Sequence, residues 1–357
     1  MEQTEKEKPN LWYNWNTILS KNRLFNFVVG IRGGGKTYGA TKFAINAWLK
    51  KGKKSIWMRR QATEMNNIFC RGFFQEQARK EFLDYQFKVL QSPVDGISNG
   101  YIKKKGDKEW TQFMLFMPLS IALKQKSTYL GEYDYIWYDE FLIDIQNTNL
   151  RYLSGWNEPR IFLEYYESVA RTRPNVRAIF IGNAIASVNP YFTAFNIKFD
   201  KNNEWLLTDY VCVHNYTNKK FRDMKTKSAW GQFLETTEYG KYNLDNEFIN
   251  ESDAFIEKPS TRAIPMFNID YMNKIYTILS DIRSGKVYVS DHIVPDIQTY
   301  CFTTDDMKPN LMMIDRVKSN PGGLVSYMLK KSFKGGYLYY NSMETKVRFY
   351  EFVNLLV

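Results

Sequence analysis

Short runs of apolar, β-branched and aromatic residues alternate with longer helix-like stretches between residues 23 and about 213. Strands buried on both faces of a sheet appear as continuous apolar runs, and their alternation with helices is typical of a parallel sheet. The pattern predicts strands at residues 25–29, 55–59, 135–139, 177–181 and 205–213. We therefore expect residues 1–197 to form an α/β domain.

Two helices are predicted between these strands. The first begins near Lys36, carries an apolar stripe that would face the sheet, and ends at Lys50-Lys51-Gly52, where basic residues suit the helix dipole. The second spans residues 158–170, with proline in its first turn and Pro174 beyond its end.

The second part of the chain has a different pattern. Residues 198–246 are polar and charged, so we expect a linker or small subdomain there. Residues 247–357 show strand-like runs at 286–290 and 336–340, a helix-like stretch at 270–283 and an apolar helix from 347 to the end. They predict a smaller C-terminal domain of mixed α/β structure.

Composition narrows the class of protein. The 357 residues favour about two domains, and 44% apolar with 17% aromatic residues are enough to fill two cores. Three widely separated cysteines without C-x-x-C spacing argue against a disulfide framework or a zinc site and suit a reducing cytoplasm. No stretch predicts a signal peptide or a membrane span. The net charge of +11 favours a polyanionic partner such as nucleic acid, with solubility or a lipid surface as alternatives.

The segment between the first predicted strand and the first predicted helix matches G-x-x-x-x-G-K-[ST] at every defined position. Its residues are Gly30, Ile31, Arg32, Gly33, Gly34, Gly35, Lys36 and Thr37. The glycines would let backbone N–H groups close around phosphate oxygens, Lys36 would reach the β and γ phosphates, and the Thr37 hydroxyl would bind Mg²⁺. A chance glycine-rich turn is the alternative, but the flanking elements favour an ATP-binding loop.

Polar residues follow two other predicted strands. Asp139 and Glu140 end one of them, and Asn183 follows the strand at 177–181. After a phosphate-binding loop, Asp139 is expected to hold Mg²⁺ and Glu140 to orient and deprotonate the attacking water. Asn183 would lie in the crevice at the carboxyl edge of the sheet, where it can sense the γ-phosphate or position water. Ordinary solvated strand ends are the alternative for all three residues.

These motifs together resemble the φ29-like phage DNA-packaging ATPases. The features that carry the resemblance are Arg32 two positions after the first glycine of the loop, the strand end Asp139-Glu140-Phe141, and the run at residues 176–184 that continues to residue 192. Further similar segments lie at residues 237–240, 244–246, 255–258 and 302–306, so the resemblance spans nearly the whole chain.

The resemblance implies a P-loop NTPase of the additional-strand, catalytic-glutamate class, related to terminase large-subunit ATPases. It further implies a motor that hydrolyses ATP with Mg²⁺ and assembles as a homo-oligomeric ring, a pentamer in this family. Such a ring sits on the portal of a phage prohead in the host cytoplasm, attached transiently, and drives double-stranded DNA inside. Arg171 falls where the family places an arginine finger that acts on the neighbouring subunit's ATP, with Arg173 as the fallback.

For the C-terminal domain, the resemblance implies a degenerate RNase H-like nuclease that no longer cuts and that docks on the prohead, in some members through a packaging RNA. The acids Asp281, Asp291, Asp305 and Asp306 show no spacing assignable to a two-metal nuclease, which agrees with that loss.

Contacts with DNA are expected from basic loops that meet phosphates without reading bases, because a packaging motor must accept any sequence. The candidates are Lys103, Lys104, Lys105, Lys124 and Lys126. A solvated face is the alternative for each of them.

Other functions stay open at this point. One is a terminase-type motor with an active nuclease, or another P-loop translocase such as a helicase. Another is a nucleic-acid-binding capsid component without enzymatic activity. The intact set of Lys36, Thr37, Asp139 and Glu140 argues against the second, because an inactive site would be expected to lose at least one of them.

Overall fold

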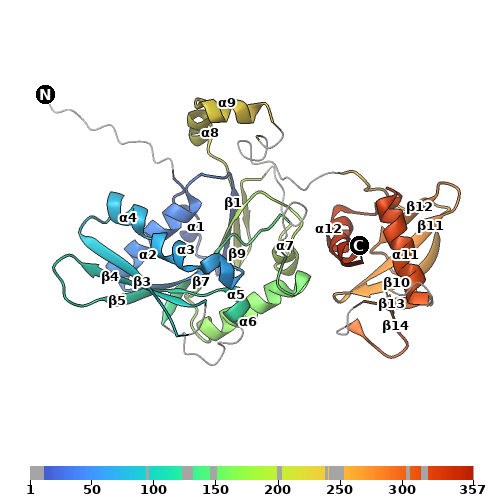
Figure 1. Cartoon of the computed structure of the whole chain (residues 1–357), viewed down its shortest axis with the longest axis horizontal. Helices are drawn as coiled ribbons and strands as arrows, with labels where there is room; N and C mark the ends of the chain where they lie inside the picture. Colours follow the sequence, from blue (N-terminus) through green and yellow to red (C-terminus); the bar gives the residue numbers. More distant parts are fainter. Residues whose placement is uncertain are drawn as a thin grey trace. The chain divides into compact units, whose positions relative to one another are not determined.

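The computed structural model describes residues 12–93, 96–122, 132–144, 151–198, 203–237, 240, 253–302, 306–314 and 321–356. The chain divides into two compact units. The first unit comprises residues 1–153, 158–187 and 194–250, and the second comprises residues 154–157, 188–193 and 251–357. Figure 1 shows the elements of both.

A nine-stranded sheet forms the centre of the first unit, in the order β3-β4-β5-β2-β6-β7-β1-β9-β8. Its strands are β1 (Phe25–Gly30), β2 (Lys54–Met58), β3 (Tyr85–Gln91), β4 (Ser98–Lys104), β5 (Thr111–Phe116), β6 (Tyr133–Asp139), β7 (Arg177–Asn183), β8 (Trp205–Leu207) and β9 (Val211–Tyr216). The six strands from β5 to β9 in this order are parallel, whereas β3, β4 and β8 pair antiparallel at the two ends. The predicted α/β parallel sheet is therefore present.

Helices cover both faces of this sheet. The helices of this unit are α1 (Asn16–Leu19), α2 (Lys36–Lys51), α3 (Asn67–Gly72), α4 (Gln75–Lys80), α5 (Leu119–Ala122), α6 (Glu158–Ala170), the 3₁₀ turn η1 (Ala62–Met65), and α8 (Lys219–Thr226) with α9 (Ala229–Glu235), which pack on each other. Ala40 and Ala44 of α2 share a buried cluster with Val28. The adjacent Phe27 stacks on Phe180, which contacts Phe162 of α6. Because neighbouring residues of a strand point to opposite faces, α2 and α6 cover opposite sides.

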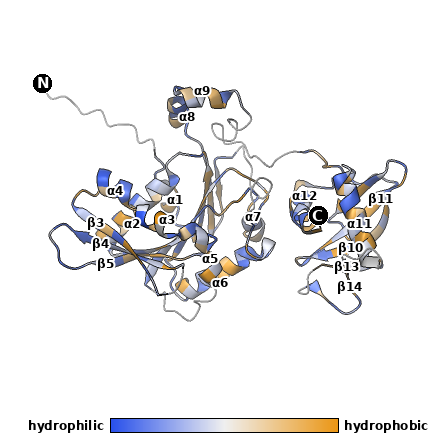
Figure 2. Cartoon of the chain, in the orientation of Figure 1, coloured by the Kyte–Doolittle hydropathy of each residue, from blue (hydrophilic) through white to orange (hydrophobic). Residues whose placement is uncertain are grey.

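Local sequence explains where α2 and α6 begin and end. Gly52 adopts a left-handed conformation after α2 and donates to the carbonyls of the last turn, as the Lys-Lys-Gly ending predicts. Along α6, hydrophobic positions alternate with polar ones in Figure 2, and the buried side includes Phe162, Tyr165 and Val169. Both predicted helices are confirmed.

Two features of the first unit were not anticipated. The single strand predicted at 205–213 is a hairpin, because the chain turns between β8 and β9 at Thr208, whose side chain accepts a hydrogen bond from the backbone N–H of Val211. Residues 85–116 form three antiparallel strands that extend the sheet. Their burial alternates only in part, so no clear period-2 pattern predicts strands there.

The second unit contains a six-stranded sheet in the order β14-β13-β10-β11-β12-β15. Its strands are β10 (Ile264–Tyr271), β11 (Lys274–Asp281), β12 (Lys286–Ser290), β13 (Thr299–Cys301), β14 (Met312–Met313) and β15 (Leu338–Tyr340). The pairs β10–β11 and β11–β12 are antiparallel, and the other three are parallel. α11 (Pro321–Lys334) and α12 (Met343–Leu356) contribute Leu329, Phe349 and Val353 to one apolar core with the sheet. The short η3 (Gly155–Asn157) and most of α7 (Pro190–Ala194) also belong to this unit.

The helix predicted at residues 270–283 is wrong. This stretch is the end of β10, a tight turn and all of β11. Met272 and Asn273 at the turn both have positive φ, 50° and 60°. Two consecutive residues with positive φ define the hairpin turn that suits the twist of antiparallel strands, and asparagine tolerates this conformation. The three cysteines are free and buried, and none of the helices among the described residues could cross a membrane.

Candidate nucleotide-binding site

The glycine-rich segment forms a tight loop between β1 and α2. Gly33 and Gly35 have φ of 84° and 71°, a conformation that other residues adopt only with strain. At Gly30, a Cβ atom would lie 2.4 Å from the backbone oxygen of Tyr216 on β9, so a side chain has no room there. The glycines thus allow the loop to turn directly from the sheet into the N-terminus of α2.

Lys36 is buried at the base of this loop. Its Nζ donates to the backbone oxygens of Gly30 and Ile31 at 2.9 and 2.7 Å and to Oδ1 of Asn183 at 3.1 Å. Burial lowers the pKa of Lys36 to about 7, although the nearby Asp139 acts in the opposite direction. An ammonium in this position is available to neutralise phosphate oxygens held by the loop.

Thr37 and Asp139 lie together at the carboxyl edge of the sheet. The Thr37 hydroxyl donates to Oδ1 of Asp139 at 3.2 Å. Burial raises the pKa of Asp139, and the guanidinium of Arg59 acts against this rise. One hydroxyl and one carboxylate are oxygen ligands of the kind that Mg²⁺ takes from a protein while it shares phosphate oxygens and waters. The residues present therefore fit a magnesium ion.

Glu140 follows the last residue of β6 and is largely exposed, with 57% of its side chain accessible. Its φ is 58°, a strained value for glutamate that costs on the order of 1–3 kcal/mol. Arg59, at the end of the neighbouring β2, places Nη2 3.0 Å from Oδ2 of Asp139 and 3.5 Å from Oε1 of Glu140. One guanidinium thus contacts both carboxylates that the sequence singled out.

A buried ion pair supports the strained backbone at Glu140. Arg60 and Glu158 are 1% and 0% exposed, and Nε of Arg60 lies 2.7 Å from Oε2 of Glu158. Arg60 also donates to the backbone oxygens of Glu140 and Phe141 at 3.4 and 2.6 Å. Glu158 accepts a further hydrogen bond from the hydroxyl of Tyr138 at 2.8 Å. The pair therefore ties the start of α6 to the turn that presents Glu140.

A single cavity of about 340 Å³ lies at this edge of the sheet. Besides the loop from Arg32 to Thr37, its walls comprise Trp12, Tyr38, Glu76, Asp139, Glu140, Ile181, Gly182 and Asn183. The structure thus brings together the predicted loop residues Arg32 to Thr37 and the flanking carboxylates in one cavity, and Asn183 joins them through Lys36. Gly30, also predicted, does not line the cavity and contacts Lys36 through its backbone oxygen. A phosphate chain with a metal ion is the ligand that such a set of amides, ammonium, hydroxyl and carboxylates is suited to hold.

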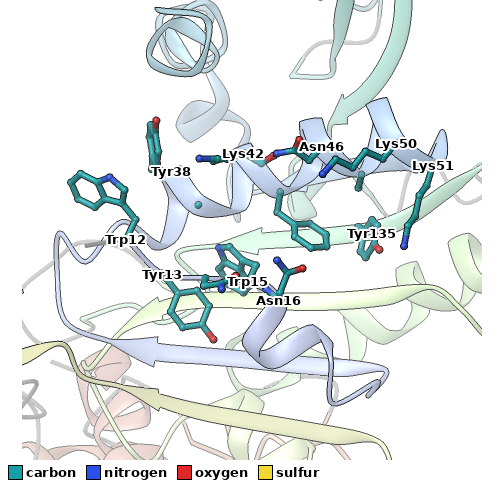
Figure 3. A pocket seen from close by; sticks show the side chains of 14 residues that line it. Trp12, Tyr13, Trp15, Asn16, Tyr38, Lys42, Asn46, Lys50, Lys51 and Tyr135 are labelled. Carbon is teal, nitrogen blue, oxygen red and sulfur yellow. Dashed lines mark hydrogen bonds between the residues drawn. The ribbon is translucent and has the colours of Figure 1, made fainter. Parts of the chain in front are cut away.

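A second cavity of about 320 Å³ lies along α2 (Figure 3). It is lined by residues 12–16, by Tyr135, and by α2 residues from Tyr38 to Lys51. Figure 3 shows Trp12 and Tyr38 together near one end of the cavity, with Lys50 and Lys51 near the other.

The two candidate arginine fingers do not line the phosphate cavity of the same chain. Arg171 directly follows α6, with φ of 47°, and its side chain is exposed. Arg173 donates through Nη2 to the backbone oxygens of Tyr133 and Val169 at 2.5 and 3.0 Å. Tyr133 begins β6 and Asp139 ends it, so Arg173 lies about 20 Å from the phosphate edge at roughly 3.3 Å per residue.

The candidate DNA-binding lysines are only partly described. Lys103 and Lys104 end β4, and the ammonium of Lys103 lies 5.0 Å from the ring centre of Trp110. Lys105 is exposed in the turn that follows. Lys124 and Lys126 lie outside the described residues.

Several residues of the site were missed from the sequence. Arg59 and Arg60 follow a predicted strand as directly as Asp139 and Glu140 do, and the same strand-end rule would have placed them at this edge. Glu158 was recognised only as the start of a helix, because nothing local marks it as the partner of Arg60. Trp12, with Tyr13 and Trp15, lies near enough to the loop in sequence to stack on a base, although the sequence favours core packing for these aromatics. Tyr38 required knowledge of how the segment before β1 folds back on the loop.

Comparisons with known proteins agree over nearly the whole chain. Residues 7–355 match the model of the family described as podovirus DNA encapsidation protein (Gp16). The chain is 32% identical over 348 residues to the DNA packaging protein of Bacillus phage PZA and 31% identical to that of Bacillus phage phi29, covering 96% of this chain and 97% of each relative. Among solved structures, it is similar to a chain of the bacteriophage Phi-29 viral genome packaging motor assembly, with a TM-score of 0.71, 30% identity and coverage of 97% and 100%. It also resembles the N-terminal domain of the DNA packaging ATPase from bacteriophage phi29, with a TM-score of 0.50, 31% identity and coverage of 59% and 99%.

Proposed function

Because the chain belongs to the podovirus DNA encapsidation protein (Gp16) family, we propose that it is an ATPase motor that moves double-stranded viral DNA into a preformed capsid. The observation that carries this proposal is the single cavity in which the glycine-rich loop, Thr37, Asp139, Glu140 and Asn183 meet. The similarity to a domain described as a DNA packaging ATPase supports hydrolysis as the energy source.

In the proposed mechanism, the loop amides and Lys36 bind the phosphates of ATP. Thr37 and Asp139 would hold Mg²⁺, which neutralises charge on the phosphate oxygens when bound. Glu140 accepts a proton from the attacking water as general base, and its exposed carboxylate leaves a water room to approach. Asn183 keeps the ammonium of Lys36 directed at the phosphates and can sense the γ-phosphate.

Arg59 has a place in this mechanism because it pairs with both acids. While its guanidinium contacts Glu140, part of the negative charge that a general base needs is neutralised. We therefore place Arg59 as a positioning residue that must release Glu140 before water is activated.

We further propose that the subunits form a ring in which Arg171 completes the neighbour's site as an arginine finger. Its position after α6, far along the sheet from the phosphate cavity, supports action between subunits rather than within one. Arg173, the fallback candidate, already binds two backbone carbonyls, which favours a role in fixing α6 to β6.

The ring proposal is tested by mixing two inactive variants, Lys36→Ala and Arg171→Ala. In mixed rings, some sites combine Lys36 from one subunit with Arg171 from the next, so ATP hydrolysis is expected to reappear at intermediate ratios. No recovery at any ratio, with assembly intact by light scattering, would overturn the trans role. Loss of ATP binding in Lys36→Ala is the separate check that the cavity is the nucleotide site.

The second unit is proposed to dock on the prohead or on nucleic acid rather than to cut it. Its strand order, with three antiparallel strands β12-β11-β10 followed by the parallel β13, supports the proposed kinship with RNase H-like nucleases. Its buried acid Asp270 is paired with Lys308 at 2.6 Å, and Asp306 accepts backbone N–H groups of Met272 and Asn273. No cluster of three potential metal ligands occurs among the described residues.

The partners that follow from this function are duplex DNA, the portal of the prohead and, by family resemblance, a packaging RNA. Among the described residues, the candidates for phosphate contacts are the half-buried Lys103 and the exposed Lys104 and Lys105. The proposed location is the host cytoplasm, with transient attachment to the prohead.

A further inference from the structure

The phosphate cavity and the second cavity along α2 share two lining side chains among the described residues, Trp12 and Tyr38. Figure 3 shows the two rings at the N-terminal end of α2, where the phosphate-binding loop ends. Their centroids are 5.8 Å apart and their planes are inclined by 46°. The two aromatic rings therefore mark the junction between the two cavities.

The two ends of the phosphate cavity are lined by different kinds of side chain. Asp139, Glu140 and Asn183 lie on the side where hydrolysis would take place, because the general base and the metal ligand must face the terminal phosphate. The remaining walls outside the loop include Trp12, Tyr38 and Glu76. We therefore expect the nucleoside end of a bound nucleotide to lie against Trp12 and Tyr38.

Trp12 is held in place by its neighbours rather than by its own burial. Tyr13 and Trp15 are 4% and 2% exposed, whereas Trp12 is 42% exposed. The backbone N–H of Tyr13 donates to the oxygen of Gly34 at 3.2 Å, and the indole N–H of Trp15 donates to the oxygen of Lys36 at 2.9 Å. The segment is thus fixed directly onto the phosphate-binding loop while the indole of Trp12 stays open to a ligand.

The neighbours of Trp12 hold its indole ring in place. A Cβ atom at Gly35 would lie 2.4 Å from the Trp12 ring, so the indole rests against the loop itself. Phe221 of α8 lies 6.4 Å from it on another side. Tyr38 is oriented by a hydrogen bond of 3.0 Å from its hydroxyl to Glu81. An indole braced in this way is a rigid platform for a flat, apolar group.

We propose that Trp12 is the base-binding residue of the site: the purine of the nucleotide stacks on its indole at the junction of the two cavities, with Tyr38 as the adjoining wall. Glu76 also lines the phosphate cavity, and its carboxylate, which pairs with Lys80, is an acceptor that the ribose hydroxyls can reach. The inference rests on the proposed ATPase function and adds to it the residues that hold the nucleoside half of the substrate.

The test compares ATP with inorganic tripolyphosphate, which has the phosphate chain but no base or sugar. Binding of each with Mg²⁺ is measured by calorimetry for the full-length wild type, Trp12→Ala, Trp12→Phe, Lys36→Ala and the control Trp230→Ala. Trp230 is the matched control because it is an exposed tryptophan, 58% accessible, on α9 and outside both cavities. Stacking of a base on an aromatic ring predicts a loss of ATP affinity of about 10-fold or more in Trp12→Ala.

Tripolyphosphate affinity is expected to be unchanged in Trp12→Ala, and Trp12→Phe is expected to keep most of the ATP affinity. Equal weakening of both ligands would mean that Trp12 only supports the loop, and unchanged ATP affinity would mean that the base lies elsewhere; either result overturns the inference. The proposed function fails separately, when Lys36→Ala leaves the binding of both ligands intact.

Discussion

Each unit places a buried carboxylate at the end of an inner strand of its sheet, but the groups that surround the two carboxylates differ. Asp139 in the first unit adjoins a cavity of about 340 Å³, a hydroxyl and a loop of backbone amides. Asp270 in the second unit is equally buried, and both acids are paired with a cation, Asp139 with Arg59 and Asp270 with the ammonium of Lys308, so the difference lies in the cavity, hydroxyl and amides beside Asp139. Oxygen donors and space for phosphate beside a buried acid are what suit it to hold a metal ion, and they are the basis for the proposed magnesium site at Asp139.

Asparagine substitutions at these two positions are the largest expected contrast. Asp139→Asn removes the proposed magnesium ligand and should lower Mg²⁺-dependent ATP hydrolysis by about 10²-fold or more. Asp270→Asn should leave hydrolysis within about twofold of wild type. Equal losses of ATP hydrolysis by the two folded variants in steady-state assays would contradict the claim that only Asp139 serves the nucleotide site.

The supporting ion pair gives the next largest effect. Removing one partner of a buried pair leaves an uncompensated charge, so Arg60→Ala should lower the free energy of unfolding by about 3–5 kcal/mol. Arg160, 81% exposed, pairs with Glu164 on the surface of α6, and Arg160→Ala should cost no more than about 0.5 kcal/mol. Urea denaturation of the two variants measures both values. Similar losses in the free energy of unfolding would show that the Arg60–Glu158 pair does not support the backbone at Glu140.

The comparison also shows what the sequence could predict. The sequence could predict the loop, Asp139, Glu140 and Asn183 as site residues because each lies at the end of an apolar run. Parallel strands bring such ends to one edge of the sheet. Arg60 with Glu158 and Asp270 with Lys308 are separated by 98 and 38 residues, and each pair forms only through folding. The hairpin of β10 and β11 was mistaken for a helix because the deciding feature is the positive φ at Met272 and Asn273.

The acidity of Lys36 gives a smaller but specific effect. Its pKa is about 7 in the free protein, against 10.5 for an ordinary lysine, and bound phosphates would favour the charged form. At pH 8.5, ATP binding should therefore take up close to one proton, and at pH 6 almost none from this group. Between pH 7 and 10.5, Lys36 is mostly neutral in the folded protein but protonated in the unfolded chain. The unfolded state therefore binds more protons, and the free energy of unfolding rises with pH in this range.

Proton uptake is measured by calorimetry in buffers of different ionisation enthalpy. Lys36→Arg is the control, because an arginine remains charged throughout this range and should take up no proton. Equal uptake by wild type and Lys36→Arg at pH 8.5 would show that the proton goes to another group.

The smallest expected effect belongs to the acid of the second unit. Lys308 is 58% exposed, and its contact with Asp270 raises the pKa of the Lys308 ammonium. Lys308→Ala removes the partner of the buried Asp270 carboxylate, but water can take the place of the exposed ammonium, so the loss of unfolding free energy should be smaller than in Arg60→Ala. ATP hydrolysis should not change, and a large loss of hydrolysis would connect the second unit to the nucleotide site.

Steady-state ATP hydrolysis by the purified protein tests the central claim most directly. It is measured without nucleic acid, with duplex DNA and with single-stranded DNA, using Glu140→Gln as the blank. The account predicts hydrolysis that duplex DNA stimulates more than single strands, and a loss of about 10²-fold or more in Glu140→Gln with ATP binding retained. Hydrolysis by Glu140→Gln at the wild-type rate, or a preference for single strands, would contradict it.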